Sequence, residues 1–250
     1  MKVTHMKRIA LALGLLLATP AFAQDTMSDA QRTAFRAEVR AYLMENPEVL
    51  MEAFRALEQR QQAAKANTDV SLAQTYTAQL HNDPNSFVGG NPDGDVIMVE
   101  FMDYKCGYCK KAFPEVNTLL TTDGNIKHII KEFPILGAQS IMASQFAIAT
   151  RIVAGDEAYK AVHNTLMEFR GDVTMDMLGR LSDTLDLDKA SILVEMQGAQ
   201  VAKIINDNRR LGQAMQITGT PTFVVDDQML RGYVPYDKMA QIVAEIRDDG

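Results

Sequence analysis

Two cysteines separated by two residues are the side chains of this sequence best suited to chemistry. They are Cys106 and Cys109, in the segment Lys105-Cys-Gly-Tyr-Cys-Lys110, and the 250-residue chain has no other cysteine. A pair at this spacing can exchange disulfides, supply half of a zinc site, attach a haem or form an inert bridge. A bridge across so short a loop constrains little of the chain, which favours a redox role.

The metal and haem alternatives lack the ligands they need. A zinc site requires two further thiolates or imidazoles, and His81, His128 and His163 show no ligand-like spacing. A c-type haem site requires a histidine directly after the second cysteine, where Lys110 stands. We therefore expect no cofactor and no bound metal.

The first 23 residues have the pattern of a secretory signal peptide. A basic start is followed by a ten-residue apolar run and by Ala21-Phe22-Ala23, a small-residue cleavage site before Gln24. Removing residues 1–23 leaves 22 Lys and Arg against 32 Asp and Glu. A net charge of −10 in the mature chain argues against a nucleic-acid partner, and an exported chain is expected in the periplasm.

The elements around the cysteines determine how reactive they can be. The run VIMVEF at 96–101 is apolar on both faces, as in a central strand, and helical periodicity follows Cys109. A helix that begins at the motif places Cys106 at its N-terminus, where free N–H groups and the helix dipole stabilise a thiolate. Cys109 then lies one turn further on and more buried. Cys106 is thus the expected attacking sulfur and Cys109 the resolving one.

The remaining pattern alternates strands with helices. Residues 28–80 are helical in period, with a third, weaker helix expected over about 69–80, and are followed by the turn-rich segment HNDPNSFVGGNPDGD. Further strands are predicted at 126–133, 222–225 and about 229–231, a long helical stretch at 139–211, and a last helix from Pro235.

Three segments carry a resemblance to a known family. EFMDYKCGYC, KEFPIL and TGTPTF resemble the DsbA-like branch of the thioredoxin superfamily. The resemblance implies an α/β thioredoxin-like fold over 96–247, with a helical domain inserted at 139–211. An N-terminal α-helical segment at 24–81 and a linker at 82–95 precede it.

The resemblance also implies roles for individual residues. Pro221 matches the family's cis-proline opposite the active site, although Thr-Pro alone favours an ordinary trans bond, and Thr220 would pair with substrate backbone. Glu100 stands where the family carries a buried acid that exchanges the proton of Cys109, and strand alternation independently places it on a buried face. The alternative is an ion pair between Glu100 and Lys131. Gly107 and Tyr108 form the dipeptide that tunes the pair and meets substrate.

The N-terminal stretch EVRAYLMENPEVLMEAFRALEQR resembles the oligomerisation region of the suppressor-of-copper-sensitivity C proteins, a DsbA-like subgroup. Two interpretations stay open, self-association through residues 28–80 and a helical arm packed on its own domain.

We therefore expect a periplasmic thiol:disulfide oxidoreductase, acting as an oxidase or an isomerase. Its substrates would be exported proteins with cysteines, and its recycling partner a membrane protein of the DsbB or DsbD type. The alternative function is a copper-binding or chaperone-like module of thioredoxin fold without turnover.

Overall fold

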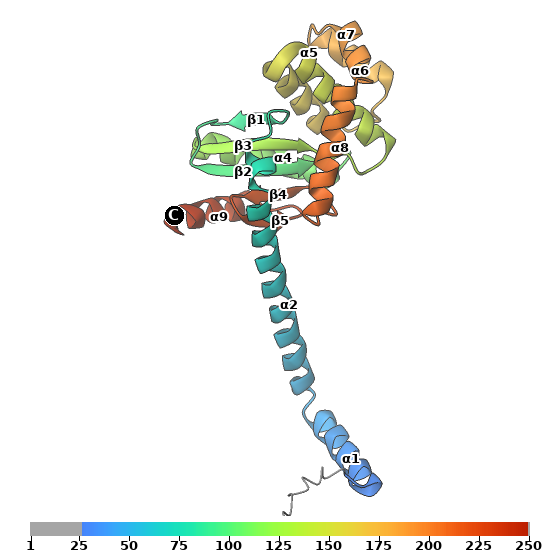
Figure 1. The fold of residues 1–250 in the computed structure, drawn as a ribbon, viewed down its shortest axis with the longest axis vertical. Coiled ribbons are helices and arrows are strands. Elements are labelled where there is room, and N and C mark those ends of the chain that lie inside the picture. Colours follow the sequence, from blue (N-terminus) through green and yellow to red (C-terminus); the bar gives the residue numbers. More distant parts are fainter. Residues whose placement is uncertain (1–26, 250) are drawn as a thin grey trace, which may run out of the picture. The chain divides into compact units, whose positions relative to one another are not determined.

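A computed structural model describes residues 27–249, so the expected signal peptide lies outside the described residues. Figure 1 shows the order of the elements. The elements are α1 (Asp29–Glu45), α2 (Glu48–Thr75), α3 (Thr77–His81), β1 (Phe87–Gly90), β2 (Val96–Met102), α4 (Gly107–Asp123), β3 (Ile126–Glu132), α5 (Ala138–Glu168), α6 (Met175–Thr184), α7 (Lys189–Glu195), α8 (Ala199–Ala214), β4 (Thr222–Val225), β5 (Gln228–Arg231) and α9 (Tyr236–Asp249). No helix in this part of the chain has the length and apolar character that a membrane crossing requires.

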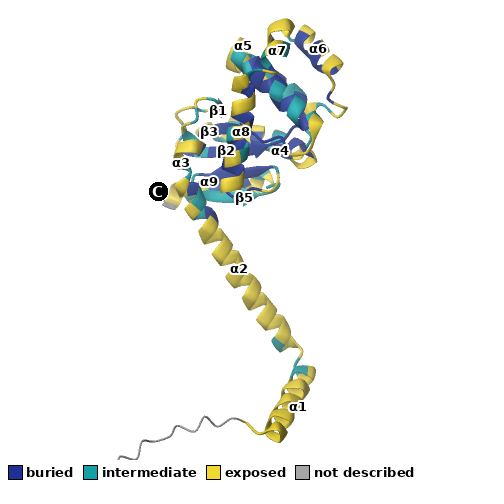
Figure 2. Ribbon diagram, turned by 45° about the vertical axis from the view of Figure 1, so that its right-hand side comes forward, coloured by how far each residue is buried: buried dark blue, intermediate teal, exposed yellow. Residues whose placement is uncertain are grey.

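The chain forms two compact units that meet in sequence within α2, after Glu58. The first contains α1 and the start of α2. Ser28 and Gln31 form a capping box, in which each side chain bonds the other's backbone N–H and fixes where α1 begins. None of the residues of α1 is buried. Figure 2 shows α1 and the beginning of α2 as almost entirely exposed.

The second unit is built on a five-stranded sheet of order β1-β3-β2-β4-β5. β2 runs parallel to β3, and the other three pairings are antiparallel. The four strands predicted from the sequence are confirmed, and the turn-rich segment contributes β1 at the sheet edge. In the register of β2 and β3, Glu100 lies opposite Ile130.

Helices cover both faces of this sheet. Met98 and Phe223 belong to one apolar cluster with residues of α4 and α9. Val99 and Phe101 point the other way and pack with Leu80 of α3 and Met215 after α8. Alternate residues of β2 therefore pack into apolar clusters on opposite faces of the sheet, which is why its sequence is mostly apolar.

The helices α5 to α8 interrupt the sheet order between β3 and β4, as expected for an inserted helical domain. Their own core includes Phe146, Leu166 and Leu178 and continues to the two cysteines. Gly155 has a φ of 83° inside α5, a conformation that other residues adopt only at a cost.

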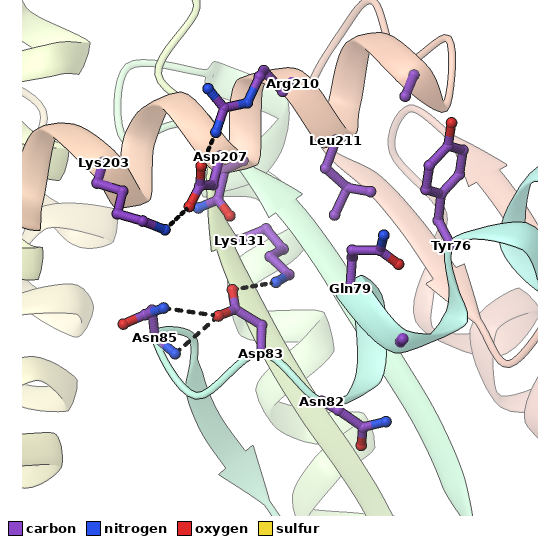
Figure 3. A pocket seen from close by; sticks show the side chains of 13 residues that line it. Tyr76, Gln79, Asn82, Asp83, Asn85, Lys131, Lys203, Asp207, Arg210 and Leu211 are labelled. Carbon is purple, nitrogen blue, oxygen red and sulfur yellow. Dashed lines mark hydrogen bonds and ion pairs between the residues drawn. The ribbon is translucent and has the colours of Figure 1, made fainter.

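Two ion pairs attach the segments before β2 to the sheet. Arg231 of β5 contacts both carboxylate oxygens of Asp69 in α2, at 2.6 and 3.2 Å. Lys131 of β3, only 1% exposed, donates to Asp83 at 2.6 Å (Figure 3). The last turns of α2 thus belong to the second unit, so the first unit ends earlier than the linker at 82–95 that the sequence pattern indicates.

Candidate active site

Cys106 is the N-cap residue of α4, directly after the turn that follows β2. Its extended backbone (φ −75°, ψ 117°) lets the Cys109 N–H donate to its sulfur at 3.4 Å. The Asp103 side chain holds the turn, because it accepts from the N–H of Lys105 at 2.8 Å. A short N-capping turn therefore aims the sulfur along the axis of the helix.

The surroundings of Cys106 favour its thiolate. A hydrogen bond from Cys109 makes the largest contribution to lowering its pKa, which falls to about 6. Hydrogen bonds from the N–H groups of Cys109 and Tyr108 act in the same direction, while burial opposes them. Cys106 keeps 6% of its surface exposed and is the outer of the two sulfurs.

Cys109 has the opposite environment. It is completely buried, and burial raises the pKa of its thiol far above the usual range, with Cys106 and the Glu100 carboxylate adding to the effect. Both thiols are free, so the structure describes the reduced pair. The outer sulfur is suited to attack, and the inner one must lose a proton before it can react.

The Thr220–Pro221 peptide bond is cis, as the resemblance implies. It lies just before β4, and the Cys106 thiol donates to the Thr220 carbonyl oxygen at 3.1 Å. Thr222 bonds back to the Gly219 carbonyl at 2.9 Å and braces the bend. The loop therefore presents a backbone acceptor directly beside the reactive sulfur.

Glu100 is buried on the sheet face that strand alternation predicts, with 3% of its surface exposed. Its partner is not Lys131, so that alternative is wrong, because Lys131 lies on the opposite face and pairs with Asp83. Instead, Oε2 of Glu100 lies 3.1 Å from Nε2 of His128, two residues before Ile130 on the neighbouring strand. Oε1 has no hydrogen-bond partner.

The comparisons with known proteins agree with this geometry. Residues 97–244, more than half of the chain, match the family described as DSBA-like thioredoxin domain. The chain belongs to this family. Residues 31–64 match the copper resistance protein ScsC N-terminal domain. The resemblance to both groups is confirmed, and so is the thioredoxin-like fold with its helical N-terminal segment.

Three similar proteins illustrate the relationship. A thioredoxin-like oxidoreductase from Silicibacter pomeroyi DSS-3 is 36% identical, with a TM-score of 0.65, over 68% of this chain and 97% of that one. ScsC from Proteus mirabilis is 29% identical, with a TM-score of 0.65, over 88% and 98%. Disulfide bond formation protein D of Bacillus subtilis is 28% identical over 62% of this chain and 73% of that protein.

Some curated relatives are much longer than the part they share. The chain spans 22% of the length of a matching Na⁺/H⁺ antiporter from Salinispora arenicola. The match concerns 58% of this chain at 29% identity. Family membership and the paired thiols identify residues 97–244 as a thiol:disulfide oxidoreductase domain.

Gly107 and Tyr108 lie at the mouth of the site of this DsbA-like domain. Both are exposed, Tyr108 by 63%, and beyond the neighbouring residues and the backbone of α4 no atom lies within 4 Å of where a side chain on Gly107 would begin. The Tyr108 ring stacks against Tyr233, with the ring centres 6.5 Å apart. Lys111 Nζ lies 4.0 Å from the centre of the same Tyr233 ring, and the Tyr233 hydroxyl donates to Glu115.

Two residues that support the site, Tyr233 and Asp103, could not be identified from the sequence. Asp103 is completely buried, and its Oδ2 accepts from the N–H groups of Ile135 and Leu136 at 2.8 and 3.0 Å. Those two side chains are 39% and 52% exposed. One carboxylate thus fixes both the cysteine turn and an exposed apolar loop. Its position three residues before Cys106 was the only available signal.

A buried carboxylate at the end of β3 was also missed. Glu132 accepts hydrogen bonds from Tyr104, Tyr159 and Ser144 at 2.7 to 2.8 Å. Burial raises its pKa to about 7, although these hydrogen bonds oppose the shift. Over residues 27–249, no group of three or more His, Cys, Asp or Glu side chains is placed to hold a metal ion.

Proposed function

We propose that this protein forms or reshuffles disulfides in exported proteins, in the periplasm, through Cys106 and Cys109. One observation carries the proposal: a sulfur at a helix N-terminus, with a lowered pKa, lies 3.1 Å from the carbonyl of a cis-proline loop, and the second sulfur is buried behind it. The leader-like residues 1–23 support the location.

In the oxidising direction, a substrate thiolate attacks Sγ of Cys106 in the disulfide form. The Cys106–Cys109 bond breaks, and Cys109 leaves as a thiolate that takes up a proton. A second substrate thiolate then attacks the substrate sulfur of the mixed disulfide and releases Cys106 as a thiolate. The substrate loses two electrons and the cysteine pair gains them. The lowered pKa of Cys106 makes it the better leaving group in the last step.

The reverse sequence reduces or reshuffles a disulfide. The Cys106 thiolate attacks a substrate disulfide, and either Cys109 or another substrate thiol then breaks the mixed disulfide. For Cys109 to act, its proton must leave a fully buried site. Glu100 is the group that accepts this proton, because its carboxylate is close enough to Cys109 to affect the thiol's pKa and has one oxygen free.

Substrate backbone pairs with the Thr220 and Pro221 loop next to Cys106, as an added strand would. Gly107 leaves room for that chain, since no other part of the described structure lies within 4 Å of where its side chain would begin. Tyr108 offers an exposed aromatic face at the same rim.

Turnover assays with reduced and with scrambled model proteins test the proposal. Each direction needs its own recycling step, by a membrane redox partner in vivo and by glutathione in the assay: oxidised glutathione re-forms the Cys106–Cys109 disulfide after substrate oxidation, and reduced glutathione restores the two thiols after substrate reduction. Cys106→Ala should abolish both activities. The binding-module alternative holds instead if two results are found together. The parent protein has neither activity, and Cys106→Ala binds copper or suppresses aggregation as well as the parent does. The equilibrium of the pair with glutathione then decides between oxidase and isomerase.

We further propose that the first unit joins copies of this chain. Its helices expose large apolar side chains that no described residue of that unit covers, and residues 31–64 match the ScsC N-terminal domain. We call the large apolar side chains of these helices that are at least 40% exposed the apolar stripe: Phe35, Val39, Tyr42, Met44, Leu50, Met51, Phe54 and Leu57. A second copy with the same stripe is the simplest complementary surface.

A further inference from the structure

We propose that His128 is a proton relay, which passes the proton of Cys109 from Glu100 to water in a pocket between α4 and α5. This inference rests on the proposed function, because it concerns the step in which Cys109 gains or loses its proton. It adds a residue and an exit route to that step.

The proton of Cys109 has no direct path to solvent. Cys109 is completely buried, and the Cys106 side of the pair is the one that keeps some exposure, at 6%. During resolution Cys106 carries the substrate, so the substrate covers that side of the pair. A proton released at Cys109 must therefore leave through the protein interior, and Glu100 is the acidic group that affects the Cys109 thiol there.

A pocket of about 440 Å³ reaches Glu100. Glu100 and His128 line its floor, while helices α4 and α5 and the edge strand β1 form its walls. Its rim includes the exposed side chains of Asn117, Thr121 and Lys160, so the pocket opens to solvent. It is large enough for several water molecules, and its floor supplies polar partners for them.

His128 connects the buried acid with this pocket. Its Nε2 lies 3.1 Å from Oε2 of Glu100, within hydrogen-bond distance, and the other carboxylate oxygen is buried without a partner. The carboxylate thus has one oxygen engaged by the imidazole and one free for the Cys109 proton. An imidazole has two nitrogens, so it can take a proton on one and release it from the other.

Other titratable groups around His128 do not duplicate this connection. Lys160 and His163, both on α5, also line the pocket. His163 bonds through Nδ1 to the Tyr104 hydroxyl at 3.0 Å, and burial lowers its pKa to about 3, so it stays neutral. The lining residues of α4, of β1 and of the position after β1 carry no charge: Gly89, Gly90, Asn91, Phe113, Val116, Asn117, Leu120 and Thr121.

A two-phase reaction separates this step from the first attack. One equivalent of 5,5′-dithiobis(2-nitrobenzoate) added to the reduced full-length protein releases thionitrobenzoate twice. The first release occurs when the Cys106 thiolate attacks the reagent disulfide. The second occurs when Cys109 loses its proton and attacks Cys106, which completes the intramolecular disulfide. Stopped-flow absorbance measures both rates.

We expect His128→Gln to slow the second phase by about tenfold and to leave the first unchanged, since general acid–base groups typically contribute that much or more. His163→Gln is the matched control, a buried histidine of the same pocket without a contact to Glu100, and should leave both phases unchanged. Imidazole added to His128→Ala should restore the second phase, because the enlarged pocket admits it.

Three results would overturn the relay. They are an unchanged second phase in His128→Gln, equal slowing in His163→Gln, and a slow phase in His128→Ala that imidazole does not restore. The last would mean that His128 only positions Glu100. If Glu100→Gln is slow while His128→Gln is not, the proposed function stands and the relay fails. If the parent shows no second release, the proposed function itself fails.

Discussion

At the scale of residues, Cys106 and Cys109 are opposites although only two residues separate them. The helix N-terminus and the hydrogen bond from Cys109 stabilise a charge on Cys106, while burial disfavours one on Cys109. The sequence predicts this asymmetry, because the cysteine spacing and the strand before it fix where the helix begins. The partner of Glu100 was not predictable, because nothing in the sequence specifies the register that sets it beside His128.

The alkylation rate of Cys106 should be proportional to the fraction of its side chain that is present as thiolate. We expect the rate with iodoacetamide to rise with pH around a midpoint of about 6 and to level off above it. In Cys109→Ala the midpoint should move upward, because the largest contribution to the lowered pKa is lost. A midpoint near the unperturbed value of about 8.5 in the parent protein would contradict the helix-terminus argument.

Glu132 should make the protein less stable as pH rises from acid to neutral. Its ordinary pKa is 4.5 and its folded pKa about 7, so the folded state holds the proton longer. The contribution of Glu132 to stability is greatest below pH 4.5, falls between the two values and is constant above, a loss of about 3 kcal/mol. Urea unfolding at several pH values should show this fall as the difference in unfolding free energy between the parent and Glu132→Gln, because the buried neutral His163, which contributes in the opposite direction, is common to both. An identical pH dependence in both would contradict the assignment.

At the scale of elements, the strand and helix order was predictable because hydrophobic periodicity is strong in β2, β3 and α9. The sequence could not show how α2 ends. It continues to Thr75 and is followed by a short α3, whereas periodicity suggests a separate helix over about 69–80. Tertiary contacts decide this, since Ala73 and Leu80 are buried against the sheet.

The Asp83–Lys131 ion pair should stabilise the packing of the segment before β1 against the sheet (Figure 3). Asp83→Ala leaves the Lys131 ammonium buried without its partner and should lower the unfolding free energy by about 3 kcal/mol. In Asp83→Ala combined with Lys131→Met most of that loss should be recovered, because no charge is left unpaired. Denaturant unfolding measures both. If the double variant is no more stable than Asp83→Ala, the unpaired charge of Lys131 is not the reason for the loss of stability.

At the scale of the whole molecule, the apolar stripe of the first unit is read directly from the sequence, but its partner is not. Phe35 and Val39 lie one turn apart, as do Leu50 and Phe54, and all four are exposed. Helical periodicity in the sequence shows that these side chains share one face of their helix. Whether a second copy of the chain covers that face is found by measuring the mass of the protein in solution.

Deleting residues 28–58 should convert an oligomer into a monomer in light scattering, because the deletion removes the apolar stripe and spares the part of α2 that packs on the sheet. Phe54→Glu should weaken the same association in the otherwise intact chain. Both variants should keep the two-phase thiol reaction, which serves as the control for folding. An equal monomeric mass with and without residues 28–58 would contradict self-association.

The most direct test of the account is to trap the covalent intermediate. Cys109→Ser, mixed with a disulfide-containing peptide, should accumulate a mixed disulfide on Cys106 that mass spectrometry locates, because no second thiol can resolve it. Cys106→Ser should form almost no adduct, because Cys109 is fully buried and its thiol pKa is strongly raised. Adduct formation at Cys109 as fast as at Cys106, or none at Cys106, would contradict the assigned roles.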